Sequence, residues 1–400
     1  MAKITQVEVF KFIQPPRKPQ PGVKPDWDRP NYGRMAYITT KSMPRLKHTY
    51  NVKTNKGVLT DKPGAGGAAV VKITTEDGIY GYGSTGLYNI AAPFIENVLK
   101  PLILGLDAME IEKIWDVMFR VTSMYGRKGL VIQGISAVDI ALWDIMGKTM
   151  GLPVYQLLGG KVRDKIKVYA TGNDLERYAR LGYKANKIPA PAGPGSGREG
   201  VKLNVLAAER VAKIMGDDAE IMYDCWQGWD IEFTVKVCKE LKREGLNVRW
   251  IEEPLMADDI QGHRRLKDLL NPMGILVTTG EHEFTRWGAR ELIDAQATDI
   301  LQCDIWYSGG ISEIRKIIAY AKAHNVIVVP HCHGMPVFHV SISSLQSPFA
   351  ETLLLDSEDT ARLFLGEPPV IDGYIDVPDT PGLGYELNYD WGYMEEFHKG

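Results

Sequence analysis

The chain has 400 residues, of which 44% are hydrophobic and 24% charged, a balance typical of a soluble globular protein. The formal net charge is −3 and no basic run or stripe is present, so we expect neither nucleic acid nor a membrane surface as a partner. No uninterrupted apolar stretch approaches the roughly 18 residues of a membrane span, and the first residues lack the apolar core of a signal peptide, so we expect a cytoplasmic location.

The N-terminal region predicts a strand followed by a long segment without regular structure. Residues 3–13 alternate between apolar and polar side chains, as in a strand with one buried face. Residues 14–66 begin with closely spaced prolines, which interrupt any helix or sheet, and carry scattered aromatic and cationic side chains. We interpret this segment as a lid in which Arg45 and His48 contact a substrate. The alternative is a solvated loop.

The next stretch predicts the rest of an α+β domain. Residues 68–83 form two short apolar runs around Glu76-Asp77-Gly78, a strong signal for a β-hairpin. Residues 91–104 and 109–124 have the spacing of amphipathic helices. We therefore predict an N-terminal α+β domain over residues 1–128.

A long helix is expected to open a second domain. Apolar residues recur every three or four positions over residues 131–150, and a glycine and a proline end the pattern. Residues 154–160 predict a short helix, and residues 166–170 and 182–188 predict two strands.

Five further apolar segments each end in an ionisable residue. These residues are Asp224, Glu252, Glu281, Asp304 and His331, separated by 28, 29, 23 and 27 residues. A βα unit of a parallel barrel needs a strand plus a helical crossover of a dozen residues or more, which suits this spacing. We therefore predict five consecutive barrel strands that deliver one chemical group each to the same mouth.

One more strand, residues 349–354, carries Glu351. We place the barrel at residues 129–361. Residues 362–400 are rich in Pro, Gly and Tyr and too few for a domain, so we expect them to pack back on the N-terminal domain.

The first three members of this series predict a metal site. Three carboxylates crowded into one barrel mouth, Asp224, Glu252 and Glu281, repel one another unless a cation neutralises them. Oxygen ligands without thiolate or imidazole suit a hard ion such as Mg²⁺. The alternative is three unrelated surface carboxylates.

The remaining members predict proton transfer. Asp304 can fix the tautomer of His331 and raise the basicity of its other ring nitrogen, although a lone histidine is more often structural. Lys187 projects near the same mouth, either as a base or as a cation that holds an anionic substrate. Glu351 closes the ring as a hydrogen-bond donor or an electrostatic partner.

A divalent ion, a histidine base and an anionic substrate together describe one reaction class. The ion binds a carboxylate and stabilises the enediolate that forms when the α-proton is removed. Loss of a β-hydroxyl then gives a dehydration, whereas reprotonation gives an epimerisation.

Several motifs resemble one known family. They are Ala137–Asp144 with Gly147-Lys148, Pro153–Gly160, Trp250–Pro254 and Asp304–Gly310. These motifs are similar to those of the mandelate racemase and muconate lactonizing enzyme branch of the enolase superfamily, and the likeness covers nearly the whole chain. It implies an α/β fold, a modified (β/α)₇β barrel of the TIM type, capped by an α+β domain that the N-terminal segment and the C-terminal tail form together. It also implies a homo-oligomer.

The resemblance also implies roles for single residues. The matching positions are those of the Mg²⁺ ligands (Asp224, Glu252 and Glu281), the catalytic pair (Asp304 and His331) and the electrophilic carboxyl (Glu351). Enolase-superfamily sites use a Lys or His base with Mg²⁺. His282 and Lys187 are then expected to contact the substrate.

One departure from the family pattern favours a dehydratase. Racemases of this branch carry Lys-x-Lys on the second barrel strand, and the second lysine acts as a base. In this chain the run is Lys187-Ile188-Pro189, so a proline stands in the place of that base. A racemase needs bases on both faces of the substrate, whereas β-elimination needs His331 alone.

The leading hypothesis is thus a Mg²⁺-dependent dehydratase that converts a small sugar acid, an aldonate, to a 2-keto-3-deoxy acid. An epimerase or racemase of a 2-hydroxy or sugar acid is the alternative. A non-catalytic barrel is disfavoured, because a protein without catalysis has no reason to keep every charged residue of the series.

Overall fold

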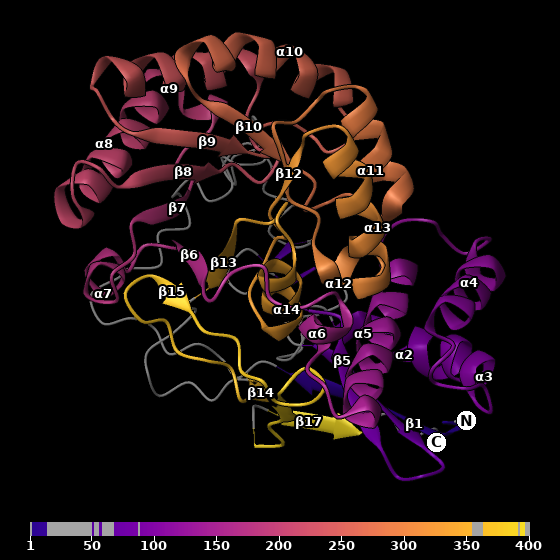
Figure 1. Ribbon diagram of the computed structural model, residues 1–400. Helices are drawn as coiled ribbons and strands as arrows, with labels where there is room; N and C mark the ends of the chain where they lie inside the picture. The colour runs from indigo at the N-terminus through magenta and orange to yellow at the C-terminus, as the bar shows by residue number, and fades with distance from the viewer. Residues whose placement is uncertain are drawn as a thin grey trace.

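The computed structural model describes residues 2–13, 50–51, 56–57, 68–86, 89–353, 363–390 and 393–396. It consists of a parallel barrel-like sheet surrounded by helices and a smaller region built around an antiparallel sheet (Figure 1). The fold class predicted from the sequence is confirmed. Most of the predicted lid, with Arg45 and His48, lies outside the described residues.

The smaller region is a four-stranded antiparallel sheet in the order β17-β1-β4-β5. Its strands are β1 (Ile4–Ile13), β4 (Ala69–Thr75), β5 (Tyr80–Ser84) and β17 (Tyr393–Glu396). The predicted hairpin is present, since β4 and β5 pair across a turn in which Gly78 has a φ of 81°. A separate pair joins β2 (Tyr50–Asn51) to β3 (Lys56–Gly57).

Five helical segments follow β5, and the first three contact β1. They are η3 (Asn89–Ala91), α2 (Ala92–Phe94), the π-helical turn η4 (Ile95–Leu99), α3 (Lys100–Ile103) and α4 (Ile111–Thr122). The two helices predicted from the sequence correspond to the run from α2 to α3 and to α4.

Helix α5 (Leu130–Met150) lies between the antiparallel sheet and the barrel. Its backbone approaches β5 so closely that a Cβ on Gly83 would lie 1.9 Å from the carbonyl oxygen of Ala137. Glycine is therefore required there for packing. Among the described residues this helix alone is long and apolar enough to span a membrane, and 83% of its apolar window is buried, as for a helix that packs inside a protein.

Eight parallel strands form the barrel in the order β12-β11-β10-β9-β8-β7-β6-β13. They are β6 (Ile166–Thr171), β7 (Ala185–Pro189), β8 (Glu220–Asp224), β9 (Val248–Glu252), β10 (Leu276–Thr279), β11 (Ile300–Leu301), β12 (Ile327–Val328) and β13 (Phe349–Leu353). Every barrel strand predicted from the sequence corresponds to one of these. A second apolar cluster, separate from the main core, fills the space between the barrel strands. Its members include Tyr169, Met222 and Trp250.

Helices connect successive strands and surround the sheet (Figure 1). After α6 (Val154–Leu157) they are α7 (Leu175–Arg180), η5 (Pro194–Ser196), α8 (Gly197–Met215), α9 (Ile231–Arg243), α10 (Ile260–Leu270), η6 (Asn271–Met273), α11 (Thr285–Asp294), α12 (Ile305–Ser308), α13 (Gly310–Ala323) and α14 (Met335–Ser343). The buried stripes of α8 to α11 face the sheet, and their polar faces remain outside.

The C-terminal segment returns to the antiparallel sheet. In it, β14 (Phe364–Leu365) pairs with β16 (Glu386–Leu387), and β17 pairs with β1. Another strand, β15 (Tyr374–Ile375), pairs with the first barrel strand β6. The segment therefore packs on the N-terminal region, as expected, and also touches the barrel. We refer to the antiparallel sheet, its helices and this segment as the cap.

A buried carboxylate joins three parts of the cap. Asp144 in α5 accepts hydrogen bonds from the backbone N–H groups of Tyr82 (3.1 Å) and Leu383 (2.8 Å) and from Lys148 Nζ (2.7 Å). Its side chain has no exposed area. The two backbone N–H groups would lose this acceptor if the carboxylate were removed, and buried unpaired donors are costly. Lys148 would lose its shortest ion pair but keep the carbonyl oxygen of Tyr80 at 3.1 Å.

We predict that Asp144→Ala destabilises the folded chain by about 3 kcal/mol, because two buried N–H groups and a lysine lose their acceptor. Urea unfolding followed by circular dichroism measures the effect. Asp116→Ala is the control: it removes an exposed ion pair with Arg120 and should leave the unfolding midpoint in place. Equal urea unfolding midpoints for the two variants would contradict the role of Asp144 in holding β5 and the C-terminal segment against α5.

Candidate active site

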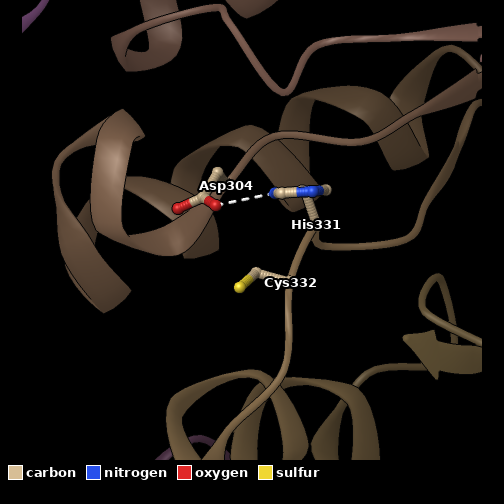
Figure 2. Close-up of side chains that lie close together, drawn as sticks. All are labelled: Asp304, His331 and Cys332. Carbon is tan, nitrogen blue, oxygen red and sulfur yellow. Dashed lines mark hydrogen bonds and ion pairs between the residues drawn. The ribbon is translucent and has the colours of Figure 1, made fainter. Parts of the chain in front are cut away.

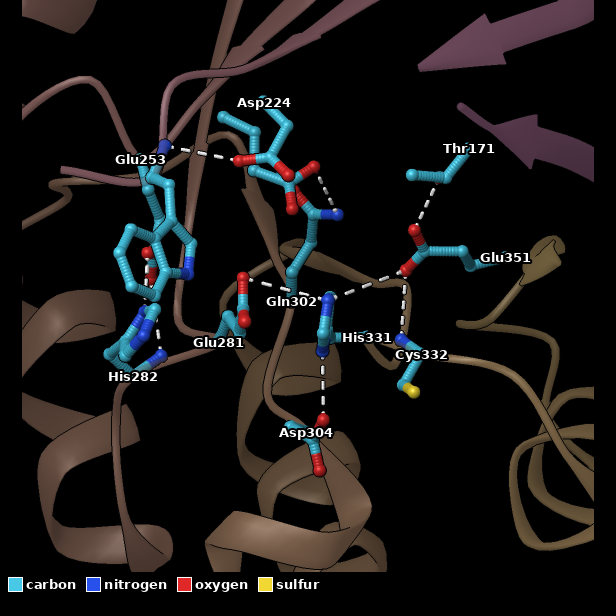
Figure 3. Close-up of polar contacts among 12 residues, drawn as sticks. Thr171, Asp224, Glu253, Glu281, His282, Gln302, Asp304, His331, Cys332 and Glu351 are labelled. Carbon is cyan, nitrogen blue, oxygen red and sulfur yellow. Dashed lines mark hydrogen bonds and ion pairs between the residues drawn. The ribbon is translucent and has the colours of Figure 1, made fainter. Parts of the chain in front are cut away.

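The ionisable series predicted from the sequence comes together at one end of the barrel. Asp224 and Glu252 are the last residues of β8 and β9 and pair in register, whereas Glu281, Asp304 and His331 follow β10, β11 and β12. Figure 3 shows the side chains of Asp224, Glu281, Asp304 and His331 gathered with Glu351 of β13. The C-terminal ends of parallel barrel strands lie at the same face, which explains the convergence.

Asp304 and His331 form a hydrogen-bonded pair (Figure 2). Asp304 Oδ2 lies 2.8 Å from His331 Nδ1, and Asp304 Oδ1 accepts from the backbone N–H groups of Trp306 (2.6 Å) and Tyr307 (3.1 Å) at the start of α12. Because a carboxylate only accepts, Nδ1 carries the proton and Nε2 is the nitrogen available for proton transfer. The hydrogen bond to Asp304 therefore fixes the tautomer and the orientation of the His331 ring.

The free nitrogen of His331 faces other carboxylates. Nε2 lies 3.5 Å from Glu281 Oε2 and 3.8 Å from Glu351 Oε2. Burial disfavours the imidazolium, but Glu281, Glu351 and Asp304 together raise the pKa of His331 well above its ordinary value. A general base must be neutral, so this histidine needs a cation on the neighbouring carboxylates before it can accept a proton.

The carboxylates themselves fit such a cation. Ligand atoms of Glu252, Glu281 and His331 all lie within 4.8 Å of one another. Burial, together with nearby carboxylates that include Asp224, raises the pKa of Glu252 to about 7 and that of Glu281 to about 8. Two buried carboxyls that resist ionisation, with Asp224 beside them, are the donor set that a divalent hard cation stabilises.

Lys187 lies beneath this cluster and is fully buried. Its Nζ is 2.7 Å from Glu252 Oε1 and 2.8 Å from Glu351 Oε1. Burial opposes its charge, but Glu252 and Glu351 raise the pKa of Lys187 well above its usual value. Lys187 is therefore a cation that binds two carboxylates. The alternative role as a base, which the sequence also allowed, would require its amine to be neutral. To contact a substrate, it would have to exchange one of these ion pairs.

Glu351 is held as an anion. It accepts hydrogen bonds from Thr171 Oγ1 and from the backbone N–H of Cys332 (2.8 Å), in addition to its ion pair with Lys187. Burial alone would raise the pKa of Glu351, but Lys187 and His331 outweigh it and lower the pKa to about 2. In this state Glu351 accepts hydrogen bonds, and the donor role predicted for it would first need proton uptake.

His282 follows Glu281, one of the predicted metal ligands, in the sequence and lies close to it and to Glu253. Its Nδ1 is 2.6 Å from Glu253 Oε2, and its ring makes an edge contact with Trp226 at 5.7 Å. Burial disfavours its charge, but Glu253 and Glu281 raise the pKa of His282 to about 9. The structure therefore places a cationic imidazole at the mouth, which suits the anionic substrate predicted to contact it.

Several supporting residues had no clear signal in the sequence. Gln302 Nε2 donates to Glu252 Oε2 at 2.9 Å, and Trp250 Nε1 lies 3.3 Å from the same oxygen. Thr171 supports Glu351 in the same way. Position at a strand end was the available signal, since Thr171 ends β6 and Gln302 follows β11. Such residues orient the groups that act on ligands.

The environment of Cys332, next to His331, disfavours its thiolate form. Figure 2 shows its side chain beside the Asp304–His331 pair. Burial raises the pKa of the Cys332 thiol well above its ordinary value, and the neighbouring carboxylates add to the effect. A protonated thiol is neither a nucleophile nor a metal ligand.

Two family models match this chain. The mandelate racemase / muconate lactonizing enzyme N-terminal domain matches residues 64–159, and the enolase C-terminal domain-like model matches residues 170–391. An L-rhamnonate dehydratase from Saccharopolyspora erythraea is 39% identical over 328 residues, which cover 80% of this chain and 83% of that protein.

Solved structures are similar over most of the chain. L-rhamnonate dehydratase from Gibberella zeae superposes with a TM-score of 0.82 at 30% identity, covering 97% of this chain and 94% of that one. The Gibberella zeae rhamnonate dehydratase complexed with Mg gives a TM-score of 0.80 at the same identity and coverage. The 3,6-anhydro-D-galactonate cycloisomerase from Zobellia galactanivorans gives 0.74 at 30% identity, covering 81% of this chain and 92% of that one.

We predict that Asp224→Asn weakens Mg²⁺ binding about 100-fold or more, since it removes one anionic oxygen ligand. Isothermal titration calorimetry with MgCl₂ on the protein without substrate measures this directly. Glu220→Gln is the control, because Glu220 lies at the opposite end of the same strand and pairs with Arg249. Equal Mg²⁺ affinity for both variants would remove Asp224 from the metal site.

Proposed function

The chain belongs to the mandelate racemase and muconate lactonizing enzyme family of the enolase superfamily, and we propose that it is a Mg²⁺-dependent dehydratase of a sugar acid. The product is a 2-keto-3-deoxy acid. The observation that carries the proposal is the single base: His331 Nε2 faces the carboxylate cluster, and Pro189 occupies the strand position where a second base could stand. The similarity to L-rhamnonate dehydratases supports a rhamnonate-like aldonate as substrate.

Proton removal is assigned to His331. Its Nε2 takes the proton from the α-carbon, and Asp304 stabilises the imidazolium that results through the hydrogen bond at Nδ1. Asp304 also caps α12 through its other oxygen, so the imidazole cannot rotate without disturbing a helix start. Orientation and electrostatic support thus come from the same carboxylate.

The negative charge that develops on the substrate carboxylate needs compensation. Asp224, Glu252 and Glu281 would hold Mg²⁺, which when bound supplies that compensation as a Lewis acid. Lys187 stabilises the ionised forms of Glu252 and Glu351 from below. His282, as a cation, adds positive potential beside Glu281.

Elimination completes the reaction. The bond between the β-carbon and its hydroxyl oxygen breaks, and the proton held on His331 Nε2 leaves with that oxygen as water. The enol that remains takes a proton from solvent at the β-carbon and releases the proton of its α-hydroxyl to solvent, which gives the keto acid. One histidine thus serves as base and then as acid, so no second base is required.

An epimerase or racemase is the second candidate. It requires a proton donor on the opposite face of the substrate. Lys187 is the basic group on that strand, but it is fully buried between Glu252 and Glu351. The cycloisomerase from Zobellia galactanivorans shares the fold, so the fold alone does not separate these reactions.

We also propose that the protein acts in the cytoplasm as a homo-oligomer, without nucleic acid or membrane partners. Charge and composition support the absence of such partners. Arg45 and His48 stay predicted substrate contacts in the segment outside the described residues.

We predict that His331→Asn abolishes dehydration, with kcat lowered about 10³-fold or more, because the proton acceptor is lost while the ring's place is filled. Keto-acid formation from a panel of stereochemically varied aldonates with MgCl₂ measures it. The control is His324→Asn at the exposed end of α13, which should keep wild-type activity. Retained turnover in the His331 variant would remove this residue from the mechanism.

We predict that in D₂O the keto product gains deuterium at the β-carbon, while recovered substrate carries none at the α-carbon. We expect loss of the β-hydroxyl to be faster than return of a proton to the α-carbon, because the protonated His331 serves as the acid for that loss. Proton NMR and mass spectrometry of product and recovered substrate distinguish the cases. Deuterium in recovered substrate with inverted configuration, without keto product, would establish the epimerase instead.

A further inference from the structure

Three carboxylates hold the segment that carries His331, one at each of three consecutive residues. His331 pairs with Asp304, the backbone N–H of Cys332 donates to Glu351 at 2.8 Å, and His333 Nε2 lies 2.9 Å from Glu367 Oε2. The first two carboxylates belong to the barrel mouth. Glu367 lies in the C-terminal segment, two residues after β14.

That part of the C-terminal segment is attached to the cap. The Phe364 ring stacks on Tyr385 with centroids 4.3 Å apart and lies 6.5 Å from the Tyr82 ring in β5. Tyr385 also donates its hydroxyl to the carbonyl oxygen of Tyr82 at 2.9 Å. Glu367 therefore connects the cap to the residue two positions after His331.

Asp304 has a similar connection. Its Oδ1 accepts from the backbone N–H of Trp306, and the indole Nε1 of Trp306 lies 3.1 Å from Ser84 Oγ at the end of β5. A Cβ on Gly86 would lie 3.5 Å from the same tryptophan, so the cap backbone packs on it. Trp306 is two positions after Asp304, as His333 is two positions after His331.

We propose that Glu367 and Ser84 are positioning residues, through which the cap sets the alignment of the Asp304–His331 pair. Glu367 acts through His333, and Ser84 acts through Trp306. The inference deepens the proposed function and rests on it for its kinetic part. It assigns the cap a part in proton transfer in addition to any contact with the substrate.

The backbone of the segment explains why outside support matters. Cys332 has a φ of 78°, a conformation that a residue other than glycine keeps when its surroundings hold it. The His333 ring is held on a second side by an edge contact with Phe338 at 5.3 Å. Without Glu367 the segment can relax, and a shift of about 1 Å in a catalytic group can cost about 100-fold in rate.

The test compares Glu367→Gln and Ser84→Ala with two matched controls. Glu386→Gln makes the same change at an exposed glutamate of the C-terminal segment, which pairs with Lys148. Ser123→Ala makes the same change as Ser84→Ala on an exposed loop after α4. Three quantities are measured for each full-length variant: kcat and KM for aldonate dehydration, the urea unfolding midpoint, and the low-field proton NMR signal of His331 Nδ1–H. Loss of this signal in His331→Asn assigns it.

Glu367→Gln and Ser84→Ala are expected to lower kcat about 10-fold to 100-fold while KM changes less than about twofold, and to shift the Nδ1–H signal. The unfolding midpoint and both controls should match the wild type. Glu367→Asp, which keeps the charge, should restore part of kcat. If Glu367→Gln does not fold, Ser84→Ala decides alone.

An unchanged Nδ1–H signal overturns the proposal, and so does a fall in kcat that only follows a loss of folded protein. If the wild type turns over no aldonate, the proposed function fails, whereas the NMR signal still decides whether the cap aligns the pair. The two failures are therefore distinguishable.

Discussion

The mouth of this barrel depends on one buried ammonium group. Lys187 has no exposed area and lies within 2.8 Å of Glu252 and Glu351, which would otherwise repel each other in a site with little water. Its charge keeps Glu351 ionised, so that Glu351 accepts the N–H of Cys332 and fixes the residue next to His331. Glu252 remains available on its other oxygen, which Gln302 orients.

The same lysine is thereby withdrawn from proton transfer, which leaves His331 as the base at the mouth. The ion pairs of Lys187 with Glu252 and Glu351 thus balance the buried charges of the site. The same ion pairs favour a reaction with one base, dehydration, over one that needs two.

Much of this could be predicted from the chain alone, because the strongest signals were local and periodic. Apolar runs that end in a charged residue, repeated at the length of a βα unit, located the strands and the mouth, since all parallel strands deliver their C-terminal ends to one face. The hairpin around Gly78 and the long helix α5 followed from turn chemistry and from helical spacing. Pro189 was informative for a similar reason: its effect depends on its place in one strand, and the strand was recognisable.

The remainder depends on contacts between residues far apart in the sequence. Nothing near Lys187 indicated that it would be enclosed by carboxylates from β9 and β13, so it was expected at the substrate. The sequence left Glu351 as a hydrogen-bond donor or an electrostatic partner, and its three partners, seen together, favour the electrostatic role. The links from Glu367 to His333 and from Ser84 to Trp306 span 34 and 222 residues, and neither has a motif. Such contacts arise from how the cap packs on the barrel, which local propensity does not encode. Arg45 and His48 lie outside the described residues.

The pairing of β1 with β17 has a consequence for how the protein is made. The cap sheet pairs β1 with β17, with Phe10 opposite Glu396, so this pair cannot form until residue 396 has been synthesised. Until then one edge of β1 lacks its partner, and unpaired strand edges promote association with other chains. Contacts between residues so distant in the chain also form slowly, since long loops must close first. The barrel strands pair mostly with their neighbours in the chain, so their contacts close shorter loops than the pairing of β1 with β17. A product that stops before β17 would leave one edge of β1 without its partner in the cap sheet, and an open strand edge favours association with other chains.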